Sequence, residues 1–135
     1  MNLTSIQSAL KEQGLDAWLF CDFHHRDPIA YRVLGLESSG LATRRWFYII
    51  PAKGEPTKLV HRIESAKLDS LPGPKLVYSA WEELHKHLKE MVAPHQQVAM
   101  QYSPMNNIPY VSLVDAGTVE LVRSFGPEEI GRAHV

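Results

Sequence analysis

The chain is poor in the features that mark several large classes of protein. It has a single cysteine, Cys21, so no disulfide can form within it, and this suits a reducing compartment. No apolar run approaches the roughly 20 residues that a membrane-spanning helix needs. The N-terminus, MNLTSIQSALKEQG, lacks the basic region and apolar core of a secretory signal. These absences predict a cytoplasmic protein with no membrane partner.

The charge of the chain is nearly balanced, with 14 Lys and Arg against 15 Asp and Glu, for a net charge of -1. Such a balance gives no broad positive field, so nucleic acid is not expected as a partner. A phosphate-binding loop is also missing, because no lysine follows the glycine-containing segment 35–40 at the required place. The length of 135 residues fits one domain.

The most informative stretch is residues 16–36, DAWLFCDFHHRDPIAYRVLGL. Its apolar run from Ala17 to Cys21 predicts a buried strand, and Pro28 opens a segment with helical spacing. Between them lies a polar cluster made of Asp22, His24, His25, Arg26 and Asp27. In open α/β sheets, ligands gather where strand ends meet helix starts, so this turn is the first candidate site.

Periodicity and turn residues predict helices that alternate with strands along the rest of the chain. Helices are expected at 2–13, 28–33, 63–70, 79–92 and 108–114. Strands are expected at 17–21, 46–50, 57–60, 75–78, 97–100 and 119–123. One hairpin, from 46 to 60, interrupts the alternation. The sequence therefore predicts an α/β protein with a mixed six-stranded sheet flanked by helices.

Cys21 is a candidate nucleophile because two histidines follow it closely and a histidine can serve as its base. Such a site would also need an orienting group and an oxyanion site. The alternative is that Cys21 is a small buried hydrophobe, as free cysteine commonly is. The seven histidines indicate no metal site, since His85 and His87 are two residues apart and do not share a helix face.

Arg44, Arg45 and Trp46 form a small basic and aromatic group at the start of a predicted strand. They could bind a carboxylate or stack against a ring, or they could be a solvated loop beside a core tryptophan. The charges at His61, Arg62 and Glu64 could contribute to a pocket or a subunit contact, or they could form surface ion pairs. No complete catalytic constellation can be assembled from these residues.

Four runs, in this order and spacing, resemble the N-terminal domain of the creatinase and Xaa-Pro peptidase family, which includes prolidase and aminopeptidase P. They are residues 16–36, quoted above, TRRWFYIIPAKGEPTKLVHRIE at 43–64, YSAWEELHKHLK at 78–89, and VAMQYSPMNNIPYVSLVDAGTVELVRSFG at 98–126. The resemblance implies a ribonuclease-H-like sheet of six strands. It also implies a non-catalytic domain that mediates dimer or tetramer contacts and helps to close the active site of a neighbouring subunit.

The resemblance places the chemistry of the family outside this chain. Two divalent metal ions (Mn, Co or Zn) would be held by two aspartates, a histidine and two glutamates of a following catalytic domain, and no position here matches those motifs. The parent enzyme would act on a peptide or a small amide. The polar turn, which differs here from the family's Arg-Gly-Ser-Asn, and the loop after the first short helix would face that substrate or a second subunit. The candidate residues for such contacts are Asp22, His25, Arg26, Arg45 and Trp46.

The last residues differ in character from the rest. Residues 130–135, IGRAHV, show no apolar period or strand pattern, and with Glu129 they resemble a translated sequencing adapter. We therefore expect a domain over residues 1–128 and a non-native tail over 129–135. Three hypotheses of function follow: an accessory domain of a Xaa-Pro peptidase-like enzyme, a stand-alone interaction module of the same fold, or a small Cys/His enzyme built on Cys21.

Overall fold

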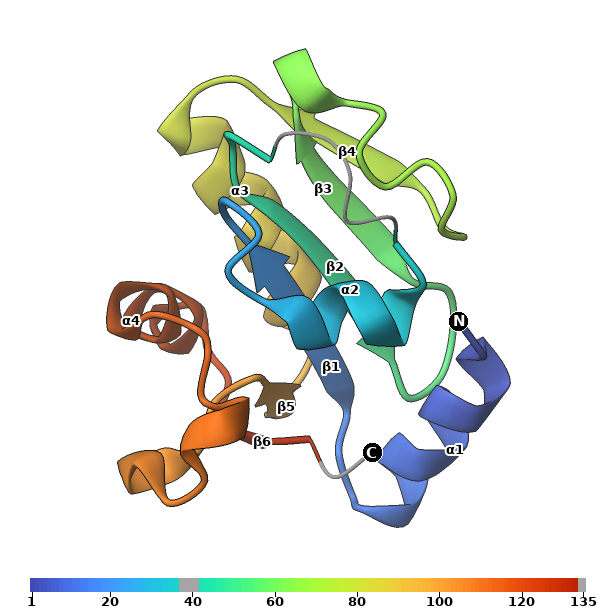
Figure 1. The fold of residues 1–135 in the computed structure, drawn as a ribbon, viewed down its shortest axis with the longest axis vertical. Coiled ribbons are helices and arrows are strands. Elements are labelled where there is room, and N and C mark those ends of the chain that lie inside the picture. The colour runs from blue at the N-terminus through green and yellow to red at the C-terminus, as the bar shows by residue number, and fades with distance from the viewer. Residues whose placement is uncertain (37–41, 134–135) are drawn as a thin grey trace.

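A mixed sheet of six strands, with helices on both faces, forms the body of the protein in a computed structural model that describes residues 1–36 and 42–133 (Figure 1). The strands are β1 (Ala17–Asp22), β2 (Trp46–Pro51), β3 (Thr57–His61), β4 (Lys75–Tyr78), β5 (Gln97–Met100) and β6 (Glu129–Arg132). Their order across the sheet is β4-β3-β2-β1-β5-β6. This confirms the predicted fold class.

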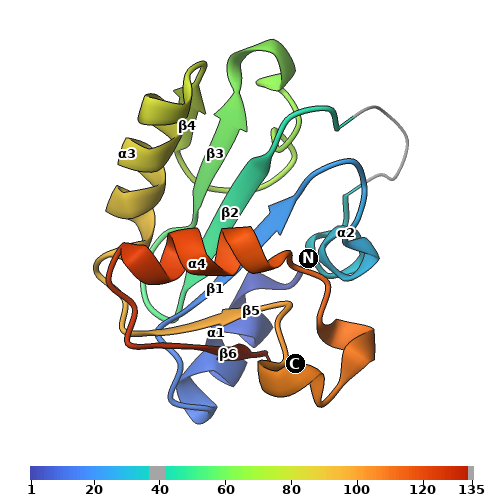
Figure 2. The same ribbon diagram turned by 90° about the vertical axis from the view of Figure 1, so that its left-hand side faces the viewer.

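Within the described residues, four helices accompany the sheet, together with three single-turn 3₁₀ segments. The helices are α1 (Leu3–Glu12), α2 (Pro28–Leu34), α3 (Trp81–Val92) and α4 (Ala116–Ser124), and the 3₁₀ segments are η1 (Arg62–Glu64), η2 (Pro104–Asn106) and η3 (Pro109–Val111). Helices α3 and α4 lie on one face of the sheet, whereas α1 and α2 lie on the other (Figure 2). Each face therefore has its own apolar core.

The central strands supply both cores because successive side chains of a strand point to opposite faces. In β1, Leu19 packs with α3 and α4, while Trp18 and Phe20 pack with α1 and α2. In β2, Phe47 and Tyr48 divide in the same way. This two-sided burial explains why these strands appear in the sequence as continuous apolar runs.

The neighbours of β1 define the edge of the sheet where a ligand would be expected. Strand β1 pairs antiparallel with β2 and parallel with β5. After β1 the chain enters α2 on one face, and after β5 it reaches α4 on the opposite face. The carboxyl ends of β1 and β5 thus form a topological switch point, which is the usual position of ligands in such sheets.

The prediction of a strand at 119–123 is wrong, because these residues belong to α4. Asp115 caps this helix, and its side chain accepts a hydrogen bond from the backbone N–H of Thr118. Val119 and Val122 are three residues apart and therefore share the helix face that packs on the sheet. The valines favour a strand locally, but the cap and this shared face produce a helix.

The sixth strand is formed instead by Glu129–Arg132, which pair in parallel with β5. The interpretation that residues 130–135 have no strand pattern is therefore wrong for residues 130–132. Ile130 is buried in the core beneath α3 and α4, and one well-placed apolar residue is sufficient for a short edge strand. The origin of residues 129–135 remains a prediction.

Two predicted short helices are also wrong. At 63–70 only the 3₁₀ turn η1 forms, since Ile63 is exposed and Leu68 packs against the sheet from a run of turns. At 108–114 only η3 forms, because the N–H groups of Leu113 and Val114 donate to the carbonyl of Gln101 rather than to a helix.

The longest predicted helix begins two residues late, at Trp81, and the Glu83 carboxylate accepts bonds from the N–H groups of Ser79 and Ala80. Residues 37–40 of segment 35–40 lie outside the described residues. They belong to the loop after α2 that the resemblance places near a substrate or a second subunit.

Candidate functional site

The turn after β1 is organised around the buried carboxylate of Asp22. One oxygen of this carboxylate accepts a bond from the N–H of Asp27 at 3.0 Å. The other accepts from the N–H of His25 at 3.1 Å and from the hydroxyl of Tyr31 at 2.9 Å. His24 and His25 both have left-handed backbone, with φ of 59° and 55°, a conformation that non-glycine residues rarely adopt. Asp22 therefore stabilises a tightly folded turn.

A second buried carboxylate extends this polar network toward β5. Asp27 caps α2 by accepting a bond from the N–H of Ala30, and it also accepts from the side-chain amide of Gln101 at 2.5 Å. The Gln101 side chain in turn accepts a bond from the indole N–H of Trp18 at 2.7 Å. Burial raises the pKa of Asp27, although these hydrogen bonds oppose the shift.

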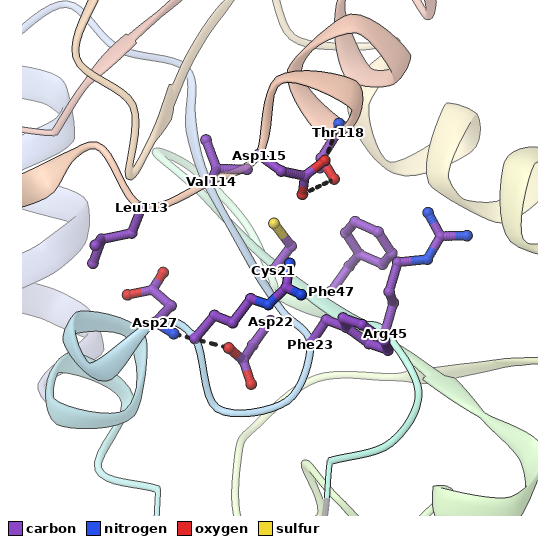
Figure 3. Close-up of a pocket in the computed structure, with 11 residues that line it drawn as sticks. Cys21, Asp22, Phe23, Asp27, Arg45, Phe47, Leu113, Val114, Asp115 and Thr118 are labelled. Atoms are coloured by element: carbon purple, nitrogen blue, oxygen red, sulfur yellow. Dashed lines mark hydrogen bonds between the residues drawn. The ribbon is translucent and has the colours of Figure 1, made fainter. Parts of the chain in front are cut away.

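A small pocket opens beside this network, between the carboxyl end of β1, the start of β2 and the N-terminus of α4 (Figure 3). Its volume is about 40 Å³, which is enough for about three water molecules. The polar lining residues are Asp22, Arg26, Asp27, Arg45, Asp115 and Thr118, and the rest of the lining is Cys21, Phe23, Phe47, Leu113 and Val114. The pocket thus combines both signs of charge with an apolar wall.

Asp115 and Thr118 belong to the pocket but were not among the predicted site residues. Burial by itself would raise the pKa of Asp115, but hydrogen bonds from the side chain and backbone of Thr118 outweigh it and lower the pKa. The signal was present in the sequence, because Asp115 and Thr118 stand at the spacing of a helix cap. A predicted strand at 119–123 hides this signal, because a strand there leaves no helix for Asp115 to cap.

The structure brings together three of the five predicted site residues. Asp22, Arg26 and Arg45 line the pocket. The guanidinium of Arg26 lies 5.3 Å from the ring centroid of Phe23, a distance at which a cation–π interaction forms.

The other two predicted site residues lie away from the pocket. The His25 ring stacks on Tyr31 with centroids 4.8 Å apart. Trp46 is fully buried in the core beneath α1 and α2, where its ring is edge-on to that of Tyr31. Of the two alternatives for Trp46, a core side chain or a ring available for stacking, the structure favours the core side chain.

Cys21 lines the pocket, but its surroundings are unsuited to a nucleophile. Burial raises the pKa of its thiol, and the nearby Asp27 and Asp115 raise it further, so the thiolate is scarce at neutral pH. In the described part of the chain, the rings of the two histidines that follow it, His24 and His25, pack on Phe23 and Tyr31.

Over residues 1–36 and 42–133, no group of three or more His, Cys, Asp and Glu side chains is arranged to hold a metal ion. No helix there has the length and apolar character to cross a bilayer. The arrangement found can hold a small polar group in the pocket, and it can present surfaces to another protein.

Known structures share this architecture across almost the whole chain. A domain described as the creatinase/prolidase N-terminal domain of a Streptococcus pyogenes X-Pro dipeptidase superposes with a TM-score of 0.70 and 13% identity, covering 96% of this chain and 91% of that one. The chain has the fold of a creatinase/prolidase N-terminal domain. At this identity the likeness shows the fold alone.

Two further structures with the creatinase/prolidase N-terminal fold differ in length. A proline dipeptidase structure from Streptococcus pneumoniae has a TM-score of 0.69 and 18% identity, and 90% of its chain is covered. The prolidase from Pyrococcus horikoshii has a TM-score of 0.62 and 14% identity, and this chain spans only 31% of it. No family model and no curated protein sequence matches the chain.

Proposed function

We propose that this chain is the non-catalytic N-terminal domain of a Xaa-Pro dipeptidase or aminopeptidase-like metallohydrolase. The observation that supports the proposal is the creatinase/prolidase N-terminal fold, together with the share of the Pyrococcus prolidase, about a third, that the chain spans. The remaining two thirds of such a chain have room for a separate domain that performs the chemistry. Fold similarity by itself does not fix the reaction, so creatinase-like hydrolysis remains the related alternative.

In this proposal the parent enzyme holds two divalent metal ions, Mn, Co or Zn, in the domain that follows. A pair of metal ions would supply a hydroxide nucleophile and stabilise the charge that develops on the scissile carbonyl. The substrate would be a peptide with proline after the cleaved bond, or a small amide. No residue of this chain takes part in those steps.

The chain itself would contribute subunit contacts and part of the wall of a neighbouring active site, in a cytoplasmic dimer. Asp22 would act indirectly, since its carboxylate is buried and holds the turn in place. Arg26 is exposed and Arg45 half-buried, so their guanidinium groups are available for a contact with substrate or subunit. The native sequence would end near residue 128, and the strand Glu129–Arg132 that pairs with β5 would then belong to the tail that follows it.

The experiment that tests this proposal is recovery of the source transcript beyond codon 128. We expect an open reading frame that encodes the family's two aspartates, one histidine and two glutamates in a following domain of roughly 250 residues. A native stop codon near this position, or a following domain without that ligand set, would contradict the proposal.

A further inference from the structure

The pocket at the carboxyl end of β1 contains two positive side chains that the fold itself does not use. Arg26, which is exposed, and Arg45, which is half-buried, both line it (Figure 3). Over residues 1–36 and 42–133, neither guanidinium group forms an ion pair or a hydrogen bond. A guanidinium group carries several N–H donors and no acceptor, so the pocket offers donors that a ligand can use.

The aspartates of the same pocket do not neutralise these two cations. Asp22 and Asp27 accept hydrogen bonds from backbone N–H groups of the turn. Asp115 accepts from the N–H and the hydroxyl of Thr118. Arg26 is near enough to help lower the pKa of Asp115, but these two described side chains form no ion pair. The carboxylates are therefore bonded within the fold, and the guanidinium groups are left for a ligand.

The size and lining of the pocket limit the anion that it can take. Its volume of about 40 Å³ is close to the space of about three water molecules, which matches a carboxylate group. The nearby aspartates disfavour a doubly charged anion such as phosphate, because repulsion grows with charge. Phe47, Leu113 and Val114 form an apolar wall, which suits a short aliphatic group attached to the carboxylate.

We propose that this pocket binds a small, singly charged carboxylate, with the guanidinium groups of Arg26 and Arg45 as its donors and the apolar wall against its aliphatic part. Arginine suits this role because its planar N–H groups match the oxygens of a carboxylate. The inference goes beyond the proposed function and does not depend on it, since every residue of the pocket belongs to this chain.

The test is a titration of the isotopically labelled chain with sodium propionate at constant ionic strength, followed by NMR. We expect the side-chain Nε–H resonances of Arg26 and Arg45 to shift and to saturate, with a dissociation constant in the millimolar range that so small a ligand allows. Propionamide has a similar shape without the charge and should cause no shift. Inorganic phosphate should bind more weakly than propionate.

Single substitutions test which cations bind the acid. Arg26→Gln and Arg45→Gln should each weaken propionate binding by about tenfold or more, because each removes a charge-assisted contact. Arg44→Gln is the matched control and should leave binding unchanged. Arg44 precedes Arg45 in the sequence, but it lies outside the pocket and its guanidinium donates to the carbonyl of Thr43 at 3.3 Å. Circular dichroism would verify that each variant is folded.

The carboxylate can come from a free short-chain acid or from the end of a peptide. Glycylalanine separates these sources, because its last residue contains the propionate skeleton within a peptide. Tighter binding of glycylalanine would assign the pocket to a peptide end, and tighter binding of propionate would assign it to a free acid. Either result supports a carboxylate site.

Four results would overturn the inference. They are arginine resonances that do not move at high propionate concentration, equal shifts with propionamide, tighter binding of phosphate than of propionate, and a loss of binding in Arg44→Gln as large as that in Arg45→Gln. None of them would contradict the proposed function, whose failure is a missing ligand set in the downstream reading frame.

Discussion

Two segments leave the same edge of the sheet, one after β1 and one after β5, and they use their polar groups in opposite ways. The turn after β1 is rich in charge, yet the carboxylates of Asp22 and Asp27 are directed inward and bonded to the turn itself. The loop after β5, residues 103–111, which we call the apolar loop, has no charged residue and leaves the side chains of Met105 and Tyr110 exposed. Dense charge here accompanies internal hydrogen bonds, whereas the uncharged segment leaves two large side chains exposed.

Asp22→Ala should give the largest effect, because it removes the acceptor on which the β1 turn depends. The substitution leaves two backbone N–H groups and the Tyr31 hydroxyl without their partner, which should lower the free energy of unfolding by about 3 kcal/mol. Urea unfolding followed by circular dichroism measures the loss. Asp69→Ala, which removes an exposed ion pair with Lys75, is the control and should leave the unfolding transition nearly unchanged.

Gln101→Ala tests whether the two segments share a support. The side chain of Gln101 bonds to both Trp18 and Asp27. Its backbone carbonyl accepts bonds from the N–H groups of Leu113 and Val114, just beyond the apolar loop. Losing the side chain should lower the free energy of unfolding by about 2 kcal/mol, because two buried polar groups lose a partner. Gln96 is exposed, so Gln96→Ala serves as the control for the loss of a glutamine side chain. Equal, small effects of the two substitutions would show that the network contributes nothing to stability.

Met105→Gly should have a smaller effect, of opposite sign. Glycine adopts a left-handed conformation without strain, and the exposed methionine side chain loses no core contact, so the fold should be stabilised by about 0.5–1 kcal/mol. Asn106→Gly is the matched control, and asparagine already tolerates this conformation, so its gain should be smaller. Thermal unfolding of both variants measures the difference, and a destabilised Met105→Gly variant would show that the loop is not strained.

The two aspartates that cap α2 and α4 should give the smallest effects, with opposite pH dependence. The pKa of Asp27 is raised in the folded state, so its contribution to stability is lost as pH rises from about 3.8 through the folded pKa. The pKa of Asp115 is lowered, so its contribution is lost as pH falls below about 3.8 toward the folded pKa. Urea unfolding of the wild type, Asp27→Asn and Asp115→Asn from about pH 3 to about pH 7 separates the two signs.

In that comparison, the stability of the wild type relative to Asp27→Asn should decrease as pH rises. Its stability relative to Asp115→Asn should increase over the lower part of the range. If the two stability differences changed with pH in the same direction, the pKa values of Asp27 and Asp115 would be shifted the same way. That result would contradict the opposite shifts of the two caps.

The fold could be predicted from the sequence where a pattern is local and repeated. Apolar runs such as 17–21 and 46–50 identify central strands, because two-sided burial requires continuous apolar character. The valines at 119–123 favour a strand, whereas the cap formed by Asp115 and Thr118 makes the segment a helix. The edge strand β6 has one buried residue, Ile130, and its place is fixed by pairing with β5, which no local pattern predicts.

The candidate site was predictable only in part, for a similar reason. Asp22 and Arg26 follow directly from the end of β1, whereas Asp115 lines the same pocket from the N-terminus of α4, nearly a hundred residues away in the sequence. His25 and Trp46 were expected beside them, but left-handed backbone at His24 and His25, and strand alternation at Trp46, place them on the other side of β1. Sequence proximity does not determine which face of a sheet a side chain reaches.

The most direct test of the central proposal, a domain that supports catalysis without performing it, is an assay of the purified chain. A dipeptide with C-terminal proline would be incubated with the chain and Mn²⁺, Co²⁺ or Zn²⁺, and the release of free proline measured against a blank with metal alone. We predict no release above the blank. Turnover by the chain itself would contradict the account, and its loss in Cys21→Ser would assign the chemistry to the thiol.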